Sequence, residues 1–196
     1  ELLETDLRTN EIKRHLGRPL DVLKTLLTFT EDEDDFPFTG GAVGYIGYDV
    51  IAQYESIGIQ LLDDRDMPDI HLLVYETIIV YDHLKQDVTI IHRGTDPSEL
   101  TNIKEQLEIK ENTLDDTLTA VAFTSNVTQE HYVDQVKKAK EHIGAGDIFQ
   151  IVLSQRLEAP FSENPFTLYR KLRKENPSPY MFYVDFDEHV ILGSSP

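Results

Sequence analysis

Residues 71–92, HLLVYETIIVYDHLKQDVTIIH, decide the fold class of this sequence. Their first half, residues 71–81, is an apolar run rich in Val, Ile and Tyr, which favour β-strands. The polar residues 82–86 interrupt the run, and residues 87–92 resume it. Two apolar runs joined by a short polar segment are typical of an antiparallel hairpin. The sequence therefore predicts one long strand over residues 71–81 that pairs with a second strand over residues 87–92.

Helical periodicity is found on both sides of this hairpin. Apolar residues recur at helical spacing in several segments, which predicts amphipathic helices over residues 20–29, 97–109, 128–143 and 165–174. Pro19 and Pro165 suit the first turn of a helix, and Thr128 can cap the helix that follows it. Gly144 and Gly146 are expected to end that helix, because glycine adopts the left-handed conformation found at helix C-termini.

The remaining apolar segments are expected to be strands. Residues 38–49 and 148–157 combine β-branched and aromatic residues, and residues 181–186 and 189–193 are expected to form the arms of a second hairpin. Because helices, strands and hairpins follow one another in mixed order, the predicted fold class is α+β with largely antiparallel sheets. The polar stretch ENTLDDT, residues 111–117, is the best candidate for a linker.

The composition argues against several classes of function. A formal net charge of -18 opposes general affinity for nucleic acid or anionic membranes, because both require a basic surface. Without cysteine, the chain has no disulfide framework, zinc–thiolate site or cysteine nucleophile. No apolar run approaches the roughly 20 residues that span a bilayer, and the first residues, ELLETDLRTN, lack the features of a signal peptide. We expect a soluble, cytoplasmic protein that binds neither nucleic acid nor membranes.

The two ends of the sequence suggest that it is a piece of a longer protein. It begins at Glu1 rather than at a methionine, and it stops at Pro196 directly after the apolar run HVILGSSP. We therefore expect further residues on either side.

General-purpose catalytic motifs are absent from the sequence. The glycines at 40, 41, 44 and 47 do not match the GxGxxG fingerprint of dinucleotide-binding proteins, and they lie inside a strand pattern. They indicate bulges or a close approach between backbone segments. The histidines lack the spacing of metal ligands, and the acidic run 31–35 is expected to be a solvated loop rather than a cation site.

Gln150 is the polar residue that the strand pattern explains least. If Phe149 and Ile151 face one side of the predicted strand, Gln150 and Val152 face the other, so that the uncharged amide lies among apolar neighbours. A buried amide requires hydrogen-bond partners. Gln150 is therefore either a functional group or a structural amide that closes a hydrogen bond within the sheet.

Several segments together resemble one enzyme family. They are IGAGDIFQIVLSQR (143–156), GGAVGYIGYD (40–49), NPSPYMFY (176–183) and ILGSSP (191–196). They resemble the chorismate-utilising family that includes anthranilate synthase, aminodeoxychorismate synthase and isochorismate synthase. The resemblance extends over essentially all of the chain from about Phe38. It implies antiparallel sheets that form a sandwich flanked by helices, incomplete in this chain. It also implies that residues 1–124 are part of the N-terminal region and that residues 125–196 begin the chorismate-binding region.

The resemblance makes Gln150 informative. Family members that add water to chorismate have a lysine at this position, and a desolvated lysine can act as a general base. Members that use ammonia have glutamine, which cannot take up a proton near neutral pH. Because ammonia is already a nucleophile, the resemblance implies that Gln150 lies near attacking ammonia. A structural amide remains the alternative.

The segment NPSPYM, residues 176–181, distinguishes the two aminating branches of the family. Taken alone, its prolines and Asn176 predict a rigid loop that ends a helix. It resembles the segment that binds the feedback inhibitor L-tryptophan in the anthranilate branch, which implies that Pro179, Tyr180 and Met181 contact the inhibitor, with Asn176 and Ser178 beside them. Aminodeoxychorismate synthases usually have a less aromatic segment here.

A second inhibitor-binding segment of the family, similar to LLES, is expected to lie before Glu1. The residues LLET at positions 2–5 look similar, but they are too close to GGAVGY to be that element. We expect them to be a chance match within a strand.

The segment GSSP, residues 193–196, resembles the start of the family signature GxSPE. The resemblance implies that the glutamates that bind Mg²⁺, an acid/base histidine and the groups that hold the carboxylates of chorismate all follow Pro196, so that no metal ligand is expected in this chain. It implies chorismate as substrate, a glutamine amidotransferase subunit as the source of ammonia, and anthranilate and pyruvate as products. The fragment itself is expected to be inactive. The alternatives are aminodeoxychorismate synthase component I and a non-catalytic amino-acid-binding or interaction domain.

Overall fold

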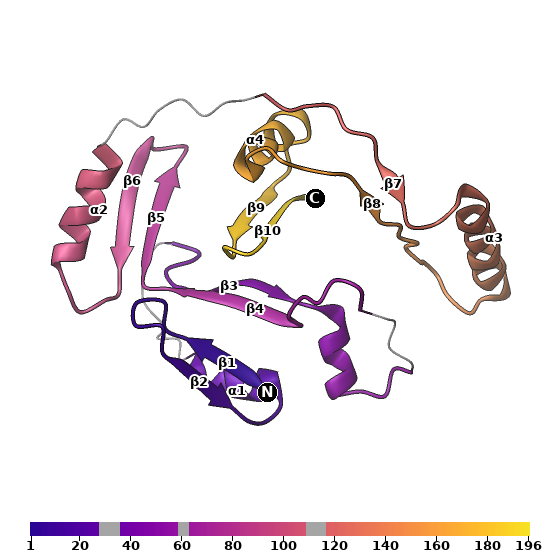
Figure 1. The fold of residues 1–196 in the computed structure, drawn as a ribbon, viewed down its shortest axis with the longest axis horizontal. Helices are drawn as coiled ribbons and strands as arrows, with labels where there is room; N and C mark the ends of the chain where they lie inside the picture. The colour runs from indigo at the N-terminus through magenta and orange to yellow at the C-terminus, as the bar shows by residue number, and fades with distance from the viewer. Residues whose placement is uncertain (28–35, 59–62, 109–116) are drawn as a thin grey trace. The chain divides into compact units, whose positions relative to one another are not determined.

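The computed structural model describes residues 1–27, 36–58, 63–108 and 117–196 (Figure 1). The acidic run 31–35 and all but the last residue of the expected linker lie outside the described residues. The chain divides into two compact units. Unit 1 is Glu1–Glu111 with Phe186–His189, and unit 2 is Asn112–Asp185 with Val190–Pro196. The division of the sequence at residue 124 stays a prediction.

Unit 1 contains three antiparallel strand pairs, β1 with β2, β3 with β4 and β5 with β6, among its described residues. Its elements are β1 (Leu2–Thr5), β2 (Ile12–His15), α1 (Pro19–Leu26), β3 (Gly41–Ile46), the 3₁₀ helix η1 (Tyr48–Gln53), β4 (Ile70–Tyr75), β5 (Thr77–Asp82), β6 (Asp87–His92) and α2 (Ser98–Glu108). The hairpin of β5 and β6 and the helices α1 and α2 were predicted from the sequence and are confirmed.

The expected single strand over residues 71–81 is wrong, because β4 and β5 are separate strands with different partners. The chain turns sharply between them (Figure 1). Glu76 lies at this bend: its carboxylate binds the guanidinium of Arg8 at 2.9 Å, and its carbonyl accepts the backbone N–H of Arg93 at 2.8 Å. These contacts come from β1–β2 and from the end of β6, so no local pattern within residues 71–81 could reveal the bend.

An aromatic cluster lies where β3 and β4 meet the turn residues 186–189 of the same unit. The ring of Phe186, which is 7% exposed, lies 4.2 Å from His71 and 4.9 Å from His189 between centroids. Tyr45 meets Phe186 edge-on at 5.7 Å. Burial lowers the pKa of His71, the neighbouring His189 lowers it further, and Glu188 opposes the change. His71 is therefore neutral in this cluster near pH 7.

Unit 2 contains two antiparallel pairs among its described residues, β7 with β8 and β9 with β10. Its elements are β7 (Thr124–Ser125), α3 (Gln129–Ala145), β8 (Leu157–Glu158), α4 (Pro165–Glu175), β9 (Tyr180–Asp185) and β10 (Val190–Ser195). The second hairpin, predicted from residues 181–186 and 189–193, is confirmed. The fold class is α+β with antiparallel strands, as the sequence predicted.

The ends of α3 and α4 follow the signals in the sequence. The hydroxyl of Thr128 accepts the N–H of His131 at 3.2 Å, which caps α3. Gly146, with φ of 84°, ends α3 in the left-handed conformation, whereas Gly144 lies inside the helix. α4 begins at Pro165, behind Asn164, whose side chain accepts the N–H of Phe166 at 2.8 Å. Local side-chain chemistry therefore determines these boundaries.

The expected strand over residues 148–157 is wrong except for its last residue. Only Leu157 of this segment belongs to a strand, in the short pair that β8 makes with β7. Phe149 is 100% exposed and Val152 is 80% exposed, so Gln150 does not lie among buried apolar neighbours. A strand is held by hydrogen bonds to a neighbouring strand, and within the described ranges no strand pairs with residues 148–156.

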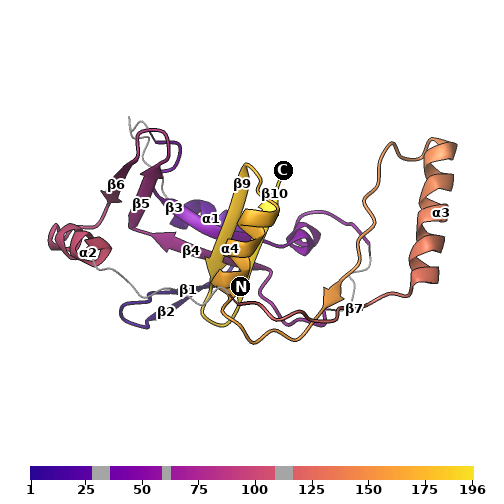
Figure 2. The ribbon, with the colours of Figure 1, turned by 90° about the horizontal axis from the view of Figure 1, so that it is seen from above.

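Helix α4 packs on the β9–β10 hairpin (Figure 2). The ring of Tyr183 on β9 meets Phe166 edge-on at 5.3 Å and Tyr169 at 5.7 Å. Thr167 on α4 is 1% exposed, so one side of this helix is fully buried. In the parts of the chain that the structure describes, no helix combines the length and apolar character needed to cross a bilayer.

Alanine at Gly44 and alanine at Gly144 are expected to have opposite effects on stability. A Cβ at Gly44 would overlap the backbone carbonyl oxygen of His71 across the β3–β4 pair, so Gly44→Ala should destabilise by about 1–3 kcal/mol. A Cβ at Gly144 meets nothing within 4 Å, and its position is helical, so Gly144→Ala should stabilise by about 0.5–1 kcal/mol. Urea unfolding of the full-length protein measures both changes. Equal effects of the two substitutions would contradict this account.

The stability of β3 and β4 is expected to fall as the pH drops below about 6.5, the pH at which an unfolded histidine takes up a proton. Because the folded pKa of His71 is lower, the unfolded state binds more protons in this window, and acid favours unfolding. The variant His71→Phe keeps an aromatic ring against Phe186 but removes this titration. Hydrogen exchange of the β4 amides in the full-length protein, compared at about pH 5.5 and 7.5, should depend less on pH in the variant. An unchanged pH dependence would be evidence against this role of His71.

Candidate functional site

Residues 176–181, which join α4 to β9 and include the first two residues of β9, contain five of the residues that the sequence analysis singled out. Asn176 is the C-cap of α4, and its backbone N–H donates to the carbonyl of Leu172 at 2.8 Å. The predicted role of Asn176 as a helix stop is confirmed. β9 begins at Tyr180, so the loop proper is short and is held by a regular element at each end. We call residues 176–181 the NPSPYM loop.

Two serine hydroxyls donate hydrogen bonds to backbone carbonyls of this loop. Ser178 Oγ donates to the carbonyl of Tyr180 at 3.0 Å, which closes the loop on itself. Ser194 Oγ on β10 donates to the carbonyl of Asn176 at 2.8 Å, which ties the start of the loop to the neighbouring strand. The end of α4, the loop and β10 are therefore connected by specific polar contacts.

The pairing of β9 with β10 places the two motifs NPSPYM and GSSP side by side. Tyr180 pairs with Ser195, and Met181 pairs with Ser194. One step further, the ring of Phe182 covers Gly193, where a Cβ would overlap it. The predictions from the sequence considered the two motifs separately and gave Ser194 no role. Ser194 lies one residue beyond the predicted arm 189–193, and extending the pairing of that hairpin by one residue would have placed it opposite Met181.

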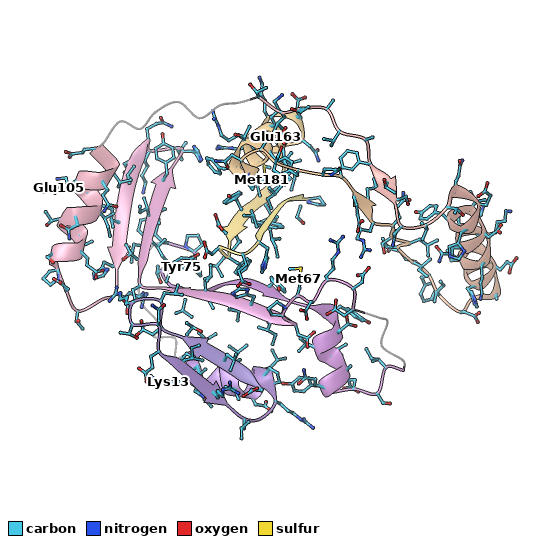
Figure 3. The ribbon with its side chains drawn as sticks, viewed as in Figure 1. Lys13, Met67, Tyr75, Glu105, Glu163 and Met181 are labelled. Atoms are coloured by element: carbon cyan, nitrogen blue, oxygen red, sulfur yellow. The ribbon has the colours of Figure 1, made fainter. Side chains whose placement is uncertain are left out.

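The NPSPYM loop presents an uncharged, partly apolar surface. Tyr180 is 71% exposed and Pro179 is exposed, whereas Ser178 and Met181 are half-buried. Figure 3 labels Met181 on β9. Beneath the loop, burial raises the pKa of Tyr183, and the nearby Asp185 adds to the effect, so this phenol stays neutral. The loop has no group that ionises near neutral pH, which makes it suited to binding rather than to proton transfer.

Gln150 lies in the irregular segment that follows α3. Its side chain is exposed and makes no hydrogen bond within the described part of the chain. The segment is held at its two ends, where Asp147 binds the imidazole of His142 at 2.8 Å and the hydroxyl of Tyr132 donates to the carbonyl of Leu153 at 3.3 Å. Among the described residues, no hydrogen bond joins Gln150 to the NPSPYM loop. Its catalytic role stays a prediction.

The expectation that this chain has no ligand for Mg²⁺ stays a prediction. Within residues 1–27, 36–58, 63–108 and 117–196, there is no group of three or more His, Cys, Asp or Glu side chains that could hold a metal ion. Mg²⁺ prefers several oxygen ligands in octahedral geometry, usually one or two carboxylates with waters and substrate oxygens. The loop and its surroundings instead provide backbone carbonyls that are already bound by serine hydroxyls.

Comparisons with known proteins identify relatives of this chain. The family model described as "chorismate binding enzyme" matches residues 3–196. Anthranilate synthase component 1 of Lactococcus lactis is 41% identical over 192 residues, which cover 91% of this chain and 42% of the relative. Aminodeoxychorismate synthase component 1 of Bacillus subtilis is 35% identical over 178 residues, which cover 85% of this chain and 38% of the relative.

A solved structure has the same fold. The crystal structure of anthranilate synthase component I from Streptococcus pneumoniae superposes with a TM-score of 0.81 and 32% sequence identity, covering 99% of this chain and 47% of that one. The chain therefore spans less than half the length of these proteins. Because the family model matches nearly all of its residues, the chain belongs to the chorismate binding enzyme family.

Proposed function

We propose that this chain is part of the large, chorismate-binding component of anthranilate synthase, a lyase of tryptophan biosynthesis. The observation that supports this most strongly is the structural match to an anthranilate synthase component I over almost all of the chain. Because the chain spans less than half of that protein, the activity is proposed for the whole protein and not for these residues alone.

In the proposed reaction, ammonia forms a bond to C2 of chorismate while the C4 hydroxyl leaves as water, and elimination of pyruvate then leaves anthranilate. Gln150 fits this chemistry, because its amide neither gains nor loses a proton near neutral pH. Ammonia has its own lone pair and requires no general base, whereas water does. The amide of Gln150 is therefore proposed to lie near the attacking ammonia, which a glutamine amidotransferase subunit supplies. The substrate and the enzyme are expected to be cytoplasmic.

Mg²⁺ is proposed as the cofactor, with ligands that are not among the described residues. When bound, it would neutralise the carboxylates of chorismate, which is a dianion. The formal net charge of -18 of this chain repels an anionic substrate, which Mg²⁺ together with basic residues elsewhere in the protein would offset.

L-tryptophan is proposed to bind at the NPSPYM loop as a feedback inhibitor. The exposed ring of Tyr180 and the adjacent Pro179 provide a flat apolar surface for an indole, with Met181 beside them. Asn176 and Ser178 supply polar groups at the start of the loop. This loop is also the feature that favours anthranilate synthase over aminodeoxychorismate synthase, the second candidate, to which one relative of this chain belongs.

The full-length protein should form anthranilate from chorismate, Mg²⁺ and ammonium, and added tryptophan should suppress the reaction. Anthranilate fluorescence measures the product directly, and chromatography of the same mixture detects an aminodeoxy product. If anthranilate forms and tryptophan does not suppress the reaction, the proposed regulatory role of the loop is wrong, but the proposed reaction stands. An aminodeoxy product would show that the protein is an aminodeoxychorismate synthase component rather than an anthranilate synthase component.

The variant Gln150→Lys should lower the rate of anthranilate formation from ammonium by about a hundredfold, the lower end of the range by which a single acid–base group changes a rate. The reason is that a lysine replaces a neutral amide by a cation that can act as a base toward water. Chromatography should reveal a hydroxylated product that the wild type does not form. The matched control is Gln155→Lys in the same segment, which should retain the wild-type rate. A wild-type rate for Gln150→Lys would show that this amide has no role in the reaction.

A further inference from the structure

The carbonyl of Asn176 is a helix-end group that needs a partner. The last carbonyls of an α-helix have no N–H of the next turn to accept from, so they accept from a side chain, from water or from a ligand instead. At the C-cap of α4 the donor is the hydroxyl of Ser194, which is 18 residues away in sequence and 2.8 Å away in space. A side chain on β10 thus completes the end of α4 at the point where the NPSPYM loop begins.

This contact restrains the start of the loop, which the hydrogen bonds between β9 and β10 do not reach. The other end is held by β9, where Tyr180 pairs with Ser195 and Met181 with Ser194. Ser194 therefore acts on both ends of the loop: its backbone lies opposite Met181, and its side chain holds Asn176. The Ser178 hydroxyl closes the middle of the loop on the carbonyl of Tyr180.

We infer that the Ser194 hydroxyl pre-organises the NPSPYM loop and thereby sets the affinity of the protein for tryptophan. The inference rests on the proposed function of this loop. A ligand that binds an ordered loop does not have to order it, so a restraint present before binding strengthens binding. Ser194 is a positioning residue in this account, because it acts through the loop and does not touch the ligand.

The matched variants are Ser194→Thr and Ser194→Val. Both side chains are β-branched, nearly identical in shape and well suited to a strand, but only threonine keeps a hydroxyl. Titration calorimetry of the full-length protein with L-tryptophan, in the absence of chorismate, measures binding without any contribution from catalysis. The Kd of Ser194→Val should be about fivefold higher than that of Ser194→Thr, which corresponds to the loss of one ordinary hydrogen bond.

A separate control distinguishes this role from general stability. Thr25 Oγ1 donates to the carbonyl of Val22 at 2.7 Å, so Thr25→Val removes the same type of bond within α1, which belongs to unit 1, whereas the loop belongs to unit 2. This variant should bind tryptophan with the wild-type Kd. Thermal unfolding should show that every variant used in the binding comparison is folded. If Ser194→Val fails to fold, Ser194→Ala replaces it as a smaller side chain without a hydroxyl.

The outcomes separate the inference from the proposed function. If the wild type binds tryptophan and Ser194→Val matches Ser194→Thr within twofold, Ser194 is only a helix cap and the inference is overturned. If Thr25→Val weakens binding equally, the effect is general destabilisation and the inference also fails. If the wild type does not bind tryptophan while still forming anthranilate, the regulatory part of the proposed function fails, and the inference fails with it.

Discussion

The antiparallel pairing of β9 with β10 is the constraint on which the candidate site depends. Because partners are set residue by residue along the two strands, Tyr180 and Met181 must lie beside Ser195 and Ser194. α4 then packs on the hairpin through its aromatic contacts with Tyr183. The NPSPYM loop therefore has both ends positioned by regular structure, and its exposed surface is the part left available for a ligand.

The bend at Glu76 has a similar role in unit 1. A continuous strand over residues 71–81 would have required one sheet, whereas the bend lets β4 pair with β3 and β5 with β6. The contact of Arg8 with Glu76 links β1–β2 to the bend, and Arg8 also meets Glu99 on α2 at 3.2 Å. Both ion pairs are largely exposed, so they contribute little to stability and serve mainly to orient the segments.

The segment 148–156 has the alternating pattern of a strand but does not form one. Its alternating apolar residues suit a strand, and Phe149 and Val152 nevertheless lie exposed. Alternation measures whether a segment can occupy a half-buried place in a sheet, but the strand forms only when a neighbour supplies hydrogen bonds and covers one face. Gln150 could be identified as unusual from the sequence, but its burial could not, because burial depends on that neighbour.

The sequence by itself determined the α+β class, the helices and the family. The ends of α3 and α4 are determined by residues at or next to those ends, namely Thr128, Gly146, Pro165 and Asn176. Such ends can be located from the sequence. Only the tertiary structure decided the division of β4 from β5, the irregular conformation of residues 148–156 and the bond from Ser194 to Asn176. Each of these depends on groups far apart in the chain, and local spacing cannot encode which distant backbone group will lie within hydrogen-bonding distance.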